Sequence, residues 1–270
     1  MLRGLYTAAS GMNAEVLEQD VVANNIANST TVGFKKDQPV FEAFPNRLLQ
    51  RIHDRMDRPQ GTVPAIVAQN MPMVPLGYLG QGVKSDGTVT QFTAGPLTRT
   101  DGKLDLALEG DGLFTVQKAD GSTAYTRAGN FTVNSAKQLT TLGGDLVMAR
   151  NGQPIVLDGK DVVVDTQGGV QVDGNTAGTL ALVSYDPARF SKVGENLWTR
   201  SEPDIEPLVQ SNPPDVTVRQ GFQEQSNVQV VSEMVRMITL MRAYEANTKT
   251  ITMQDETVSK LLTNVGTPSA

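Results

Sequence analysis

The chain has 270 residues, a formal net charge of −6, no cysteine and a single histidine, and only 5% of its residues are aromatic. The lack of cysteine excludes disulfides, cysteine-ligated metal sites and thiol nucleophiles, and one histidine excludes a multi-histidine metal site. The acidic balance argues against a nucleic-acid partner, since phosphate binding needs a basic face. The sequence contains no run of about 18 apolar residues, so we expect no membrane-spanning helix.

The N-terminal segment predicts a helix with an apolar seam. Its apolar residues recur at alternating spacings of three and four, which is the heptad pattern of helices that pair. The seam consists of Leu2, Leu5, Ala9, Met12, Val16, Ala23 and Ile26. Polar residues interrupt the first apolar stretch, so we expect no cleaved signal peptide. The pattern fades after Asn24, and Gly33 is the expected stop.

Residues 35–75 are expected to form a connecting arm. A short helix is expected from Phe41 to Ile52, and prolines then keep the chain extended. The arm is locally basic, with Arg47, Arg51, Arg55 and Arg58. We interpret these arginines as a solvated or interface face, and the single histidine, His53, as a surface residue.

The middle of the chain, residues 76–221, predicts an antiparallel sandwich or open barrel. Seven Asp-Gly or Asn-Gly pairs separate β-branched or alternating stretches at about ten-residue intervals, and such pairs favour tight hairpin turns. Glu109, Asp111 and Asp120 could be read as a calcium site or an acid–base pair. Turn formation explains both aspartates directly, because each precedes glycine.

The C-terminal segment predicts a helix of roughly 38 residues, about 57 Å long. A capping box at Ser226 and Gln229 would start it. Its seam is Val230, Met234, Met237, Met241, Tyr244, Thr248, Ile251, Asp255, Val258 and Leu262. Val231, Val235 and Ile238 widen the apolar arc beyond one seam. This favours a helix with partners on two sides over an ordinary core-facing stripe.

The predicted fold class is therefore α+β, with terminal helices that pair as a coiled coil and an inserted antiparallel all-β domain. We divide the chain into a helical polymerisation domain (1–34 plus 222–270), a connecting arm (35–75) and a β-rich outer domain (76–221). No nucleophile elbow, dinucleotide fingerprint or catalytic triad is present. We expect no catalytic residue, no cofactor and no metal, and therefore no enzyme.

Three motifs carry a family resemblance. The chain resembles the bacterial flagellar rod and hook proteins at Ala9-Ser-Gly-Met12 with the Asn-rich run from Asp20 to Lys35. It is similar to them again at Leu104 to Phe114 with Tyr125 to Phe131. A third similarity covers Gly221 to Val228 with Glu233-Met234 and Met241-Arg-Ala-Tyr-Glu245. The family-motif residues are Asn24, Asn25, Asn28, Gly33, Gly110, Gly112, Ser226 and Asn227.

The resemblance implies a structural subunit of the flagellar basal-body rod, a tubular drive shaft that transmits torque to the hook, encloses the export channel and is needed for assembly and motility. It implies location in the basal body within the periplasm and cell envelope, after type III export without a cleaved signal. The implied partners are the protein itself, other rod and hook proteins, the export apparatus and the surrounding rings, with no nucleic acid and no direct membrane insertion.

The apolar helix residues suggest where subunits would meet. We predict a polymerisation interface formed by Leu2, Leu5, Met12, Val16, Ile26, Val230, Met234, Met237, Met241, Tyr244 and Ile251. The length favours a rod protein over a hook protein and leaves proximal and distal rod types open, with a slight preference for the proximal type. A phage or secretion tail-tube protein is the alternative, which the Asn24 to Asn28 motif disfavours.

Overall fold

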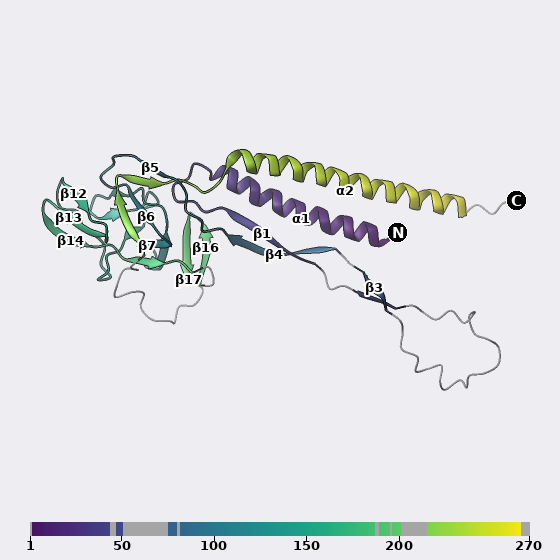
Figure 1. Cartoon of the computed structure of the whole chain (residues 1–270), viewed down its shortest axis with the longest axis horizontal. Helices are drawn as coiled ribbons and strands as arrows, with labels where there is room; N and C mark the ends of the chain where they lie inside the picture. Colours follow the sequence, from purple (N-terminus) through teal and green to yellow (C-terminus); the bar gives the residue numbers. More distant parts are fainter. Residues whose placement is uncertain are drawn as a thin grey trace, which may run out of the picture. The chain divides into compact units, whose positions relative to one another are not determined.

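A computed structural model describes residues 2–43, 47–50, 75–79, 82–186, 189–194, 196–200 and 215–265 (Figure 1). The chain divides into two compact units. Unit 1 contains Met1–Asp20, Pro39–Thr88 and Ile238–Ala270, and unit 2 contains Val21–Gln38 and Val89–Met237. These units group the residues differently from the sequence-based division at 34, 75 and 221. His53 and most of the basic arm lie outside the described residues.

Each end of the chain forms a long helix. Helix α1 spans Leu2–Ala27 and helix α2 spans Val230–Val265. At 36 residues, α2 is about three times as long as an average globular helix. Helix α1 ends six residues before Gly33, and both the backbone N and the side-chain amide of Asn28 donate to the Asn24 carbonyl oxygen in its last turn (3.1 and 3.0 Å).

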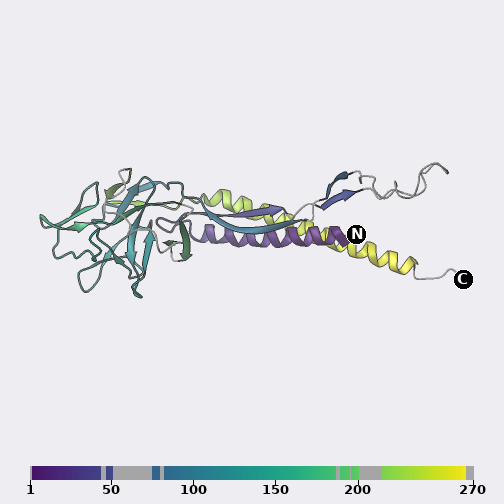
Figure 2. The same cartoon turned by 90° about the horizontal axis from the view of Figure 1, so that it is seen from below.

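Unit 1 contains strands as well as helix. Strand β1 (Asp37–Ala43) pairs with β4 (Val83–Thr90), and β2 (Arg47–Gln50) pairs antiparallel with β3 (Pro75–Leu79). The β1–β4 ribbon runs beside α1 in both views, and Val83 N lies 3.4 Å from the Ser10 hydroxyl (Figures 1 and 2). The prediction of a short helix from Phe41 to Ile52 is therefore wrong for the described residues, because these form strands β1 and β2.

Unit 2 is built from short antiparallel strands. Its largest sheet has the order β16-β17-β8-β7-β11-β10-β9, with β15 also paired to β7. The strands are β16 (Phe190–Gly194), β17 (Leu197–Arg200), β8 (Thr123–Thr126), β7 (Gly112–Gln117), β11 (Leu146–Val147), β10 (Leu139–Thr140), β9 (Thr132–Val133) and β15 (Leu182–Ser184). The predicted α+β class with an inserted antiparallel β domain is confirmed.

Three smaller sheets complete unit 2. One has the order β12-β13-β14, and two pairs join early strands to late ones, β6 to β18 and β5 to β19. The bounds are β12 (Val162–Val164), β13 (Gly169–Val172), β14 (Asn175–Thr179), β6 (Leu106–Glu109), β18 (Thr217–Gln220), β5 (Leu97–Arg99) and β19 (Phe222–Glu224). The last two pairings bring the segment before α2 back to the start of the β domain.

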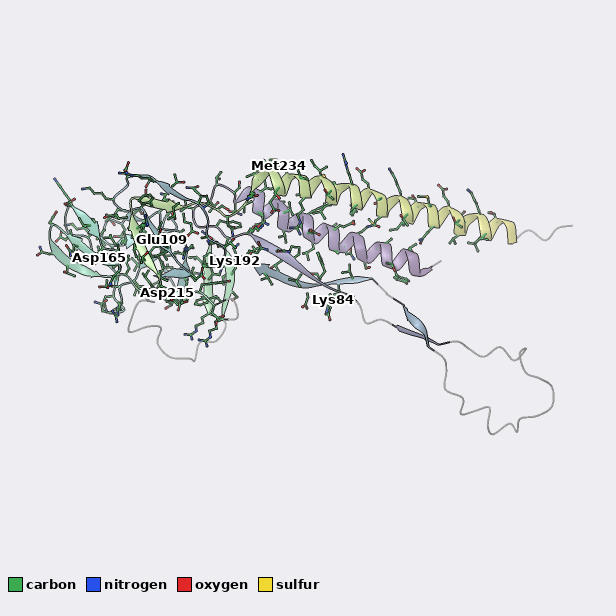
Figure 3. All side chains as sticks on the ribbon, viewed as in Figure 1. Lys84, Glu109, Asp165, Lys192, Asp215 and Met234 are labelled. Atoms are coloured by element: carbon green, nitrogen blue, oxygen red, sulfur yellow. The ribbon has the colours of Figure 1, made fainter. Side chains whose placement is uncertain are left out.

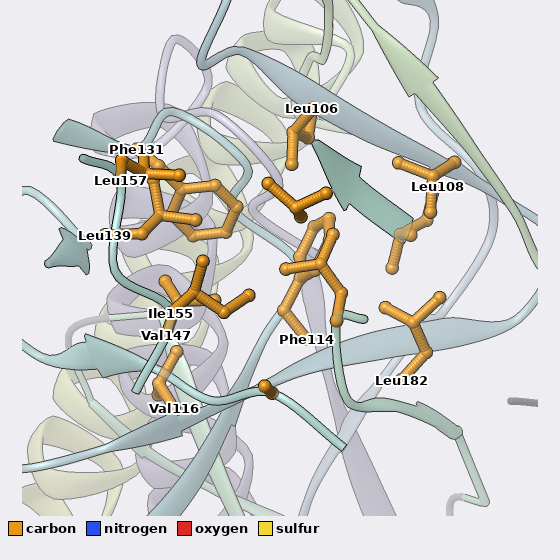
Figure 4. Packing of buried hydrophobic residues seen from close by; sticks show 14 of the residues in the cluster. Leu106, Leu108, Phe114, Val116, Phe131, Leu139, Val147, Ile155, Leu157 and Leu182 are labelled. Carbon is orange, nitrogen blue, oxygen red and sulfur yellow. The ribbon is translucent and has the colours of Figure 1, made fainter. Parts of the chain in front are cut away.

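The core of unit 2 lies on both faces of β7. Phe114 and Val116 point into the larger apolar cluster, where Phe114 meets Phe131 edge to face with ring centroids 5.1 Å apart (Figure 4). Leu113 points to the opposite face, into a smaller cluster with Trp198. Because side chains alternate along a strand, a strand buried on both faces reads as a continuous apolar run.

The Asx-Gly turns are confirmed in part. At Asp173-Gly174 both residues have positive φ (48° and 81°), and Val172 pairs with Asn175 across the two-residue turn. Asp120 accepts a hydrogen bond from Ser122 N (2.7 Å) in the β7–β8 turn, as the turn interpretation predicts. Gly112 instead begins β7, and Gly110 has the positive φ (91°).

Candidate assembly surface and junction cluster

The predicted seam of α2 repeats with the same heptad period as the less exposed side of the helix. Of the two residues that the seam places in each heptad, however, only the one in the register of Met237 is turned away from water. Met237, Tyr244 and Ile251 are half-buried as part of that seam. Met234 and Met241 are half exposed, whereas Glu233 and Leu240 beside them are buried. The less exposed positions include Glu233, Met237, Leu240, Tyr244, Asn247, Ile251, Gln254 and Val258, again in steps of four and three. Val230, at the start of α2, is half-buried.

Helix α1 shows the same offset of one residue. Its buried residues are Ala8, Val22 and Asn25, each directly before the predicted Ala9, Ala23 and Ile26. Of the predicted interface residues, Leu5, Met12 and Ile26 are half-buried, Val16 is 43% exposed, and the side chain of Leu2 lies outside the described part. The most buried residues of α1 are thus a small, an apolar and a polar one, and none of the predicted interface residues Leu5, Met12, Val16 and Ile26 is among them.

Within unit 1, contacts between α1 and α2 run in antiparallel order. A Cβ atom added at Gly4 would overlap the Gln254 amide, and one added at Gly11 would stand 3.3 Å from the Asn247 amide nitrogen. Asn247 also donates a hydrogen bond of 2.8 Å to Glu15. Higher residue numbers on α1 thus meet lower numbers on α2, and the glycines leave room for the amide side chains.

An apolar stripe remains open to water on another side of α2. We call it the helix stripe and define it by its members: Val231, Met234, Val235, Ile238 and Met241, of which Figure 3 labels Met234. Their exposed fractions lie between 50% and 76%. Their spacing of three, one, three and three residues places them on one side of the helix over about three turns. A contiguous exposed apolar stripe of this kind is typical of a protein–protein contact.

The N-terminal family-motif residues connect α1 to the β domain. Asn25 is buried, donates to the Asp37 carbonyl oxygen (2.8 Å) and accepts from Asp37 N (3.0 Å). Gly33 has a positive φ of 68°, and a Cβ there would stand 2.6 Å from the backbone of Arg127 and Ala128. These positions are therefore set by backbone contacts, which explains the Asn and Gly in the motif.

The central glycines serve the same close packing. A Cβ at Gly110, whose φ is 91°, would overlap the Asp215 carbonyl oxygen. A Cβ at Gly112 would stand 2.6 Å from a methyl group of Val216. Both glycines let the segment before β18 pass directly over the start of β7.

The C-terminal motif residues lie against the N-terminal ones. Asn227 accepts a hydrogen bond from Lys36 N (2.8 Å) and donates to the Gln91 carbonyl oxygen (2.8 Å). The Ser226 hydroxyl accepts a hydrogen bond from Val228 N (3.2 Å), two residues further along the chain. This bond closes a local turn and differs from the predicted capping box, in which Ser226 would pair with Gln229. Asn227 thus links the segments that enter and leave the β domain.

A buried group of three charges lies at this junction. We call Lys35, Arg127 and Glu224 the ion cluster; their side chains are 1–2% exposed. The Glu224 carboxylate is 2.6 Å from the Lys35 ammonium and 2.5 Å from the Arg127 Nε atom. Arg127 also donates to the carbonyl oxygens of Leu108 (2.7 Å) and Gly112. The cluster was not predicted, because its members lie about 90 residues apart in the sequence and share no local pattern.

Both cations of the ion cluster lie near the aromatic ring of Phe92, and burial and charge shift the pKa values of Lys35 and Glu224. The Lys35 ammonium lies 4.9 Å and the Arg127 guanidinium carbon 5.6 Å from the centroid of the Phe92 ring, a cation–π arrangement. Burial lowers the pKa of Lys35 below its usual value. Burial alone would raise the pKa of Glu224, but Arg127, Lys35 and their hydrogen bonds outweigh it, so this pKa is lowered.

These shifts predict how stability depends on pH. The unfolded Glu224 takes up a proton near pH 4.5, whereas the folded one does so only at lower pH. Its contribution is therefore complete above 4.5 and is lost as the pH falls from 4.5 through the folded-state pKa. The double variant Lys35→Met/Glu224→Gln should lose less stability than the unmodified protein over this interval, measured by denaturant unfolding followed through Trp198 fluorescence. An equal loss in both proteins would contradict the role of Glu224.

The described residues contain no group suited to a metal or a membrane span. Across the described ranges, no three or more His, Cys, Asp or Glu side chains gather where they could hold a metal ion. Of the helices that the structure describes, none is long and apolar enough to cross a membrane.

Three family models match the chain in order along the sequence. Residues 5–35 match the model described as flagella basal body rod protein, and residues 107–172 match the flagellar hook protein FlgE/F/G D1 domain. Residues 219–264 match the flagellar basal body rod FlgEFG protein C-terminal model. The matched segments contain most of α1, the core strand β7 and nearly all of α2, together with all three members of the ion cluster.

Curated relatives align over nearly the whole chain. The flagellar basal-body rod protein FlgG of Caulobacter vibrioides is 35% identical over 94% of this chain and 96% of its own length. FlgG of Agrobacterium fabrum is 35% identical over 98% and 100%. The flagellar hook-basal body complex protein FlhO of Bacillus subtilis is 32% identical over 98% and 99%. The chain therefore belongs to the flagellar basal-body rod protein family, a family of structural proteins rather than enzymes.

Proposed function

We propose that this protein builds the flagellar rod by polymerising through its terminal helices, with the helix stripe as the surface that contacts the next subunit. The observation that carries this proposal is the exposed apolar stripe on α2, at Val231, Met234, Val235, Ile238 and Met241. Water-exposed apolar side chains on a helix are stabilised when a neighbour covers them. The partners are further copies of this chain and other rod and hook proteins.

The division of labour follows the sequence-based domains. Residues 1–34 and 222–270 act together as the polymerisation domain, 35–75 as the connecting arm and 76–221 as the outer domain. The two helices pair as an antiparallel coiled coil, which the Glu15–Asn247 hydrogen bond and the Gly4 and Gly11 contacts support. These contacts leave the half-exposed Met234 and Met241 for contacts between subunits.

The energetics suit a shaft made of many copies. Full burial of a Met, Val or Ile side chain contributes about 1.5–3 kcal/mol, so completing the burial of a half-exposed one contributes roughly 1 kcal/mol. Five such side chains in every subunit give a modest contact that is repeated along the polymer. A tube of this kind encloses the export channel and transmits torque to the hook.

We also propose how the protein is delivered and where it is located. The protein reaches the basal body in the periplasm and cell envelope through the flagellar type III export apparatus, and the rod passes through the surrounding rings. A chain without cysteine forms no disulfide after it leaves the cytoplasm. These partners and this route are our proposals.

Electron cryomicroscopy of purified basal bodies tests the proposed function. We expect density for this chain in the rod, with the helix stripe covered by a neighbouring subunit and residues 76–221 outside the helices. A chain located outside the rod, or a helix stripe that faces the open channel, would overturn the proposal.

A further inference from the structure

The ion cluster contains one carboxylate for two buried cations. Glu224 is on β19, just before α2, whereas Lys35 follows α1 and Arg127 follows β8. Without Glu224, the Lys35 ammonium would keep only the Thr93 carbonyl oxygen (2.7 Å). Arg127 would keep two carbonyl oxygens. Two uncompensated positive charges would then share one buried site, which is strongly unfavourable.

Glu224 and its neighbour Gln225 also bind the segment that follows α1 and the start of the β domain through backbone hydrogen bonds. The Glu224 carbonyl oxygen accepts a hydrogen bond from Gly33 N (2.7 Å), and its carboxylate accepts one from Gly95 N (2.8 Å). The next residue, Gln225, donates to the Pro96 carbonyl oxygen (2.9 Å). A single residue near the C-terminal helix therefore contacts the segment that leaves α1, the start of the β domain and the end of β8.

We propose that Glu224 acts as a closure switch: its arrival orders the segment that follows α1 and the segment that precedes α2 in one step. Until β19 brings in Glu224, Lys35 and Arg127 repel each other, and Gly33 N lacks the Glu224 carbonyl oxygen to which it donates. Both helices then leave unit 2 from an ordered junction only when the C-terminal segment is in place. The proposal rests on contacts within unit 2 and does not depend on the proposed rod function.

Amide hydrogen exchange in the purified full-length protein tests the switch. In Glu224→Gln, which keeps the size of the side chain and removes its charge, the amides of Gly33 and Gln225 should both exchange at least about 100-fold faster, because breaking a buried ion pair at one partner is strongly destabilising. The matched control is Glu109→Gln, since Glu109 pairs with Arg219 at 2.9 Å on the surface. It should leave both amides unchanged.

A second variant separates charge from packing. Lys35→Met/Glu224→Gln restores the formal charge of the cluster to +1, the value in the unmodified protein, so it should recover at least about tenfold of the lost protection at Gln225. If Glu224→Gln alone is unfolded, we expect the double variant to be folded. Unchanged exchange at Gly33 in Glu224→Gln would overturn the switch. A double variant that exchanges as fast as Glu224→Gln, or that fails to fold, would also overturn it.

Discussion

Cells whose only copy of this protein has Met241→Asp are expected to lose swimming and to assemble few or no rods, while unit 2 still folds. Met241 is 52% exposed on the helix stripe, so an aspartate there costs the isolated chain little. In a contact between subunits, however, the carboxylate would be buried among apolar side chains without a partner, which costs several kcal/mol. The penalty recurs at every subunit along the polymer.

The measurements are rod counts by electron microscopy of basal bodies, and spreading in soft agar. Trp198 is the only tryptophan and is 1% exposed, so its fluorescence reports folding of unit 2 in the purified variant. Ser232→Asp is the matched control, because Ser232 is exposed on another side of the same helix and the change adds the same charge. Normal rods and swimming in Met241→Asp would show that the helix stripe is not an assembly contact.

Met237→Asp is a less specific test of the same idea. The sequence pattern treats Met237 and Met241 alike, as members of one seam. In the structure, Met237 is half-buried on the same line as buried Glu233 and Leu240. An aspartate at Met237 would therefore disturb the packing of the chain itself as well as any contact between subunits.

Gly129→Ala is expected to destabilise unit 2 by about 3 kcal/mol or more. A Cβ at Gly129 would overlap the Leu106 carbonyl oxygen, and Gly129 also accepts a hydrogen bond from Leu106 N (2.9 Å). The atoms that the added methyl group would meet belong to the Leu106 backbone, so the overlap cannot be relieved by rotating a side chain. Strand β6 would have to move out of the core instead.

Denaturant unfolding followed through Trp198 measures this loss. Gly143→Ala is the control, because its added Cβ would come no closer than 3.6 Å to another atom and its φ is not positive. We expect the control to change stability by less than about 1 kcal/mol. A loss in Gly129→Ala as small as that of the control would show that β6 accommodates the methyl group.

The two helices show what the spacing of apolar residues can and cannot predict. Steps of three and four residues correctly predict long helices at both ends and the heptad period of α2. They do not determine which side of a helix is buried, because positions one residue apart follow the same period. Gly4, Gly11, Asn247 and Gln254 look unsuited to a buried line, yet their fit to each other places them there.

The arm and the turns show where local patterns compete. Phe41 to Ile52 has spacing compatible with a helix, but pairing of β1 with β4 and of β2 with β3 overrides it. Asp173-Gly174 forms the expected hairpin turn, whereas Gly112 is taken into β7 because Gly110 already makes the tight turn. Strand pairing across the chain decides such cases.

The sequence alone determined the α+β class, the helical ends, the inserted β domain, and the family through its three motifs, because these depend on composition, period and local spacing. Only the tertiary structure revealed that the motifs meet at Lys35, Arg127 and Glu224, and that Met234 and Met241 remain open to water. The physical reason is that charge pairing and burial act between residues brought together by folding, and no local pattern encodes which distant residues will meet.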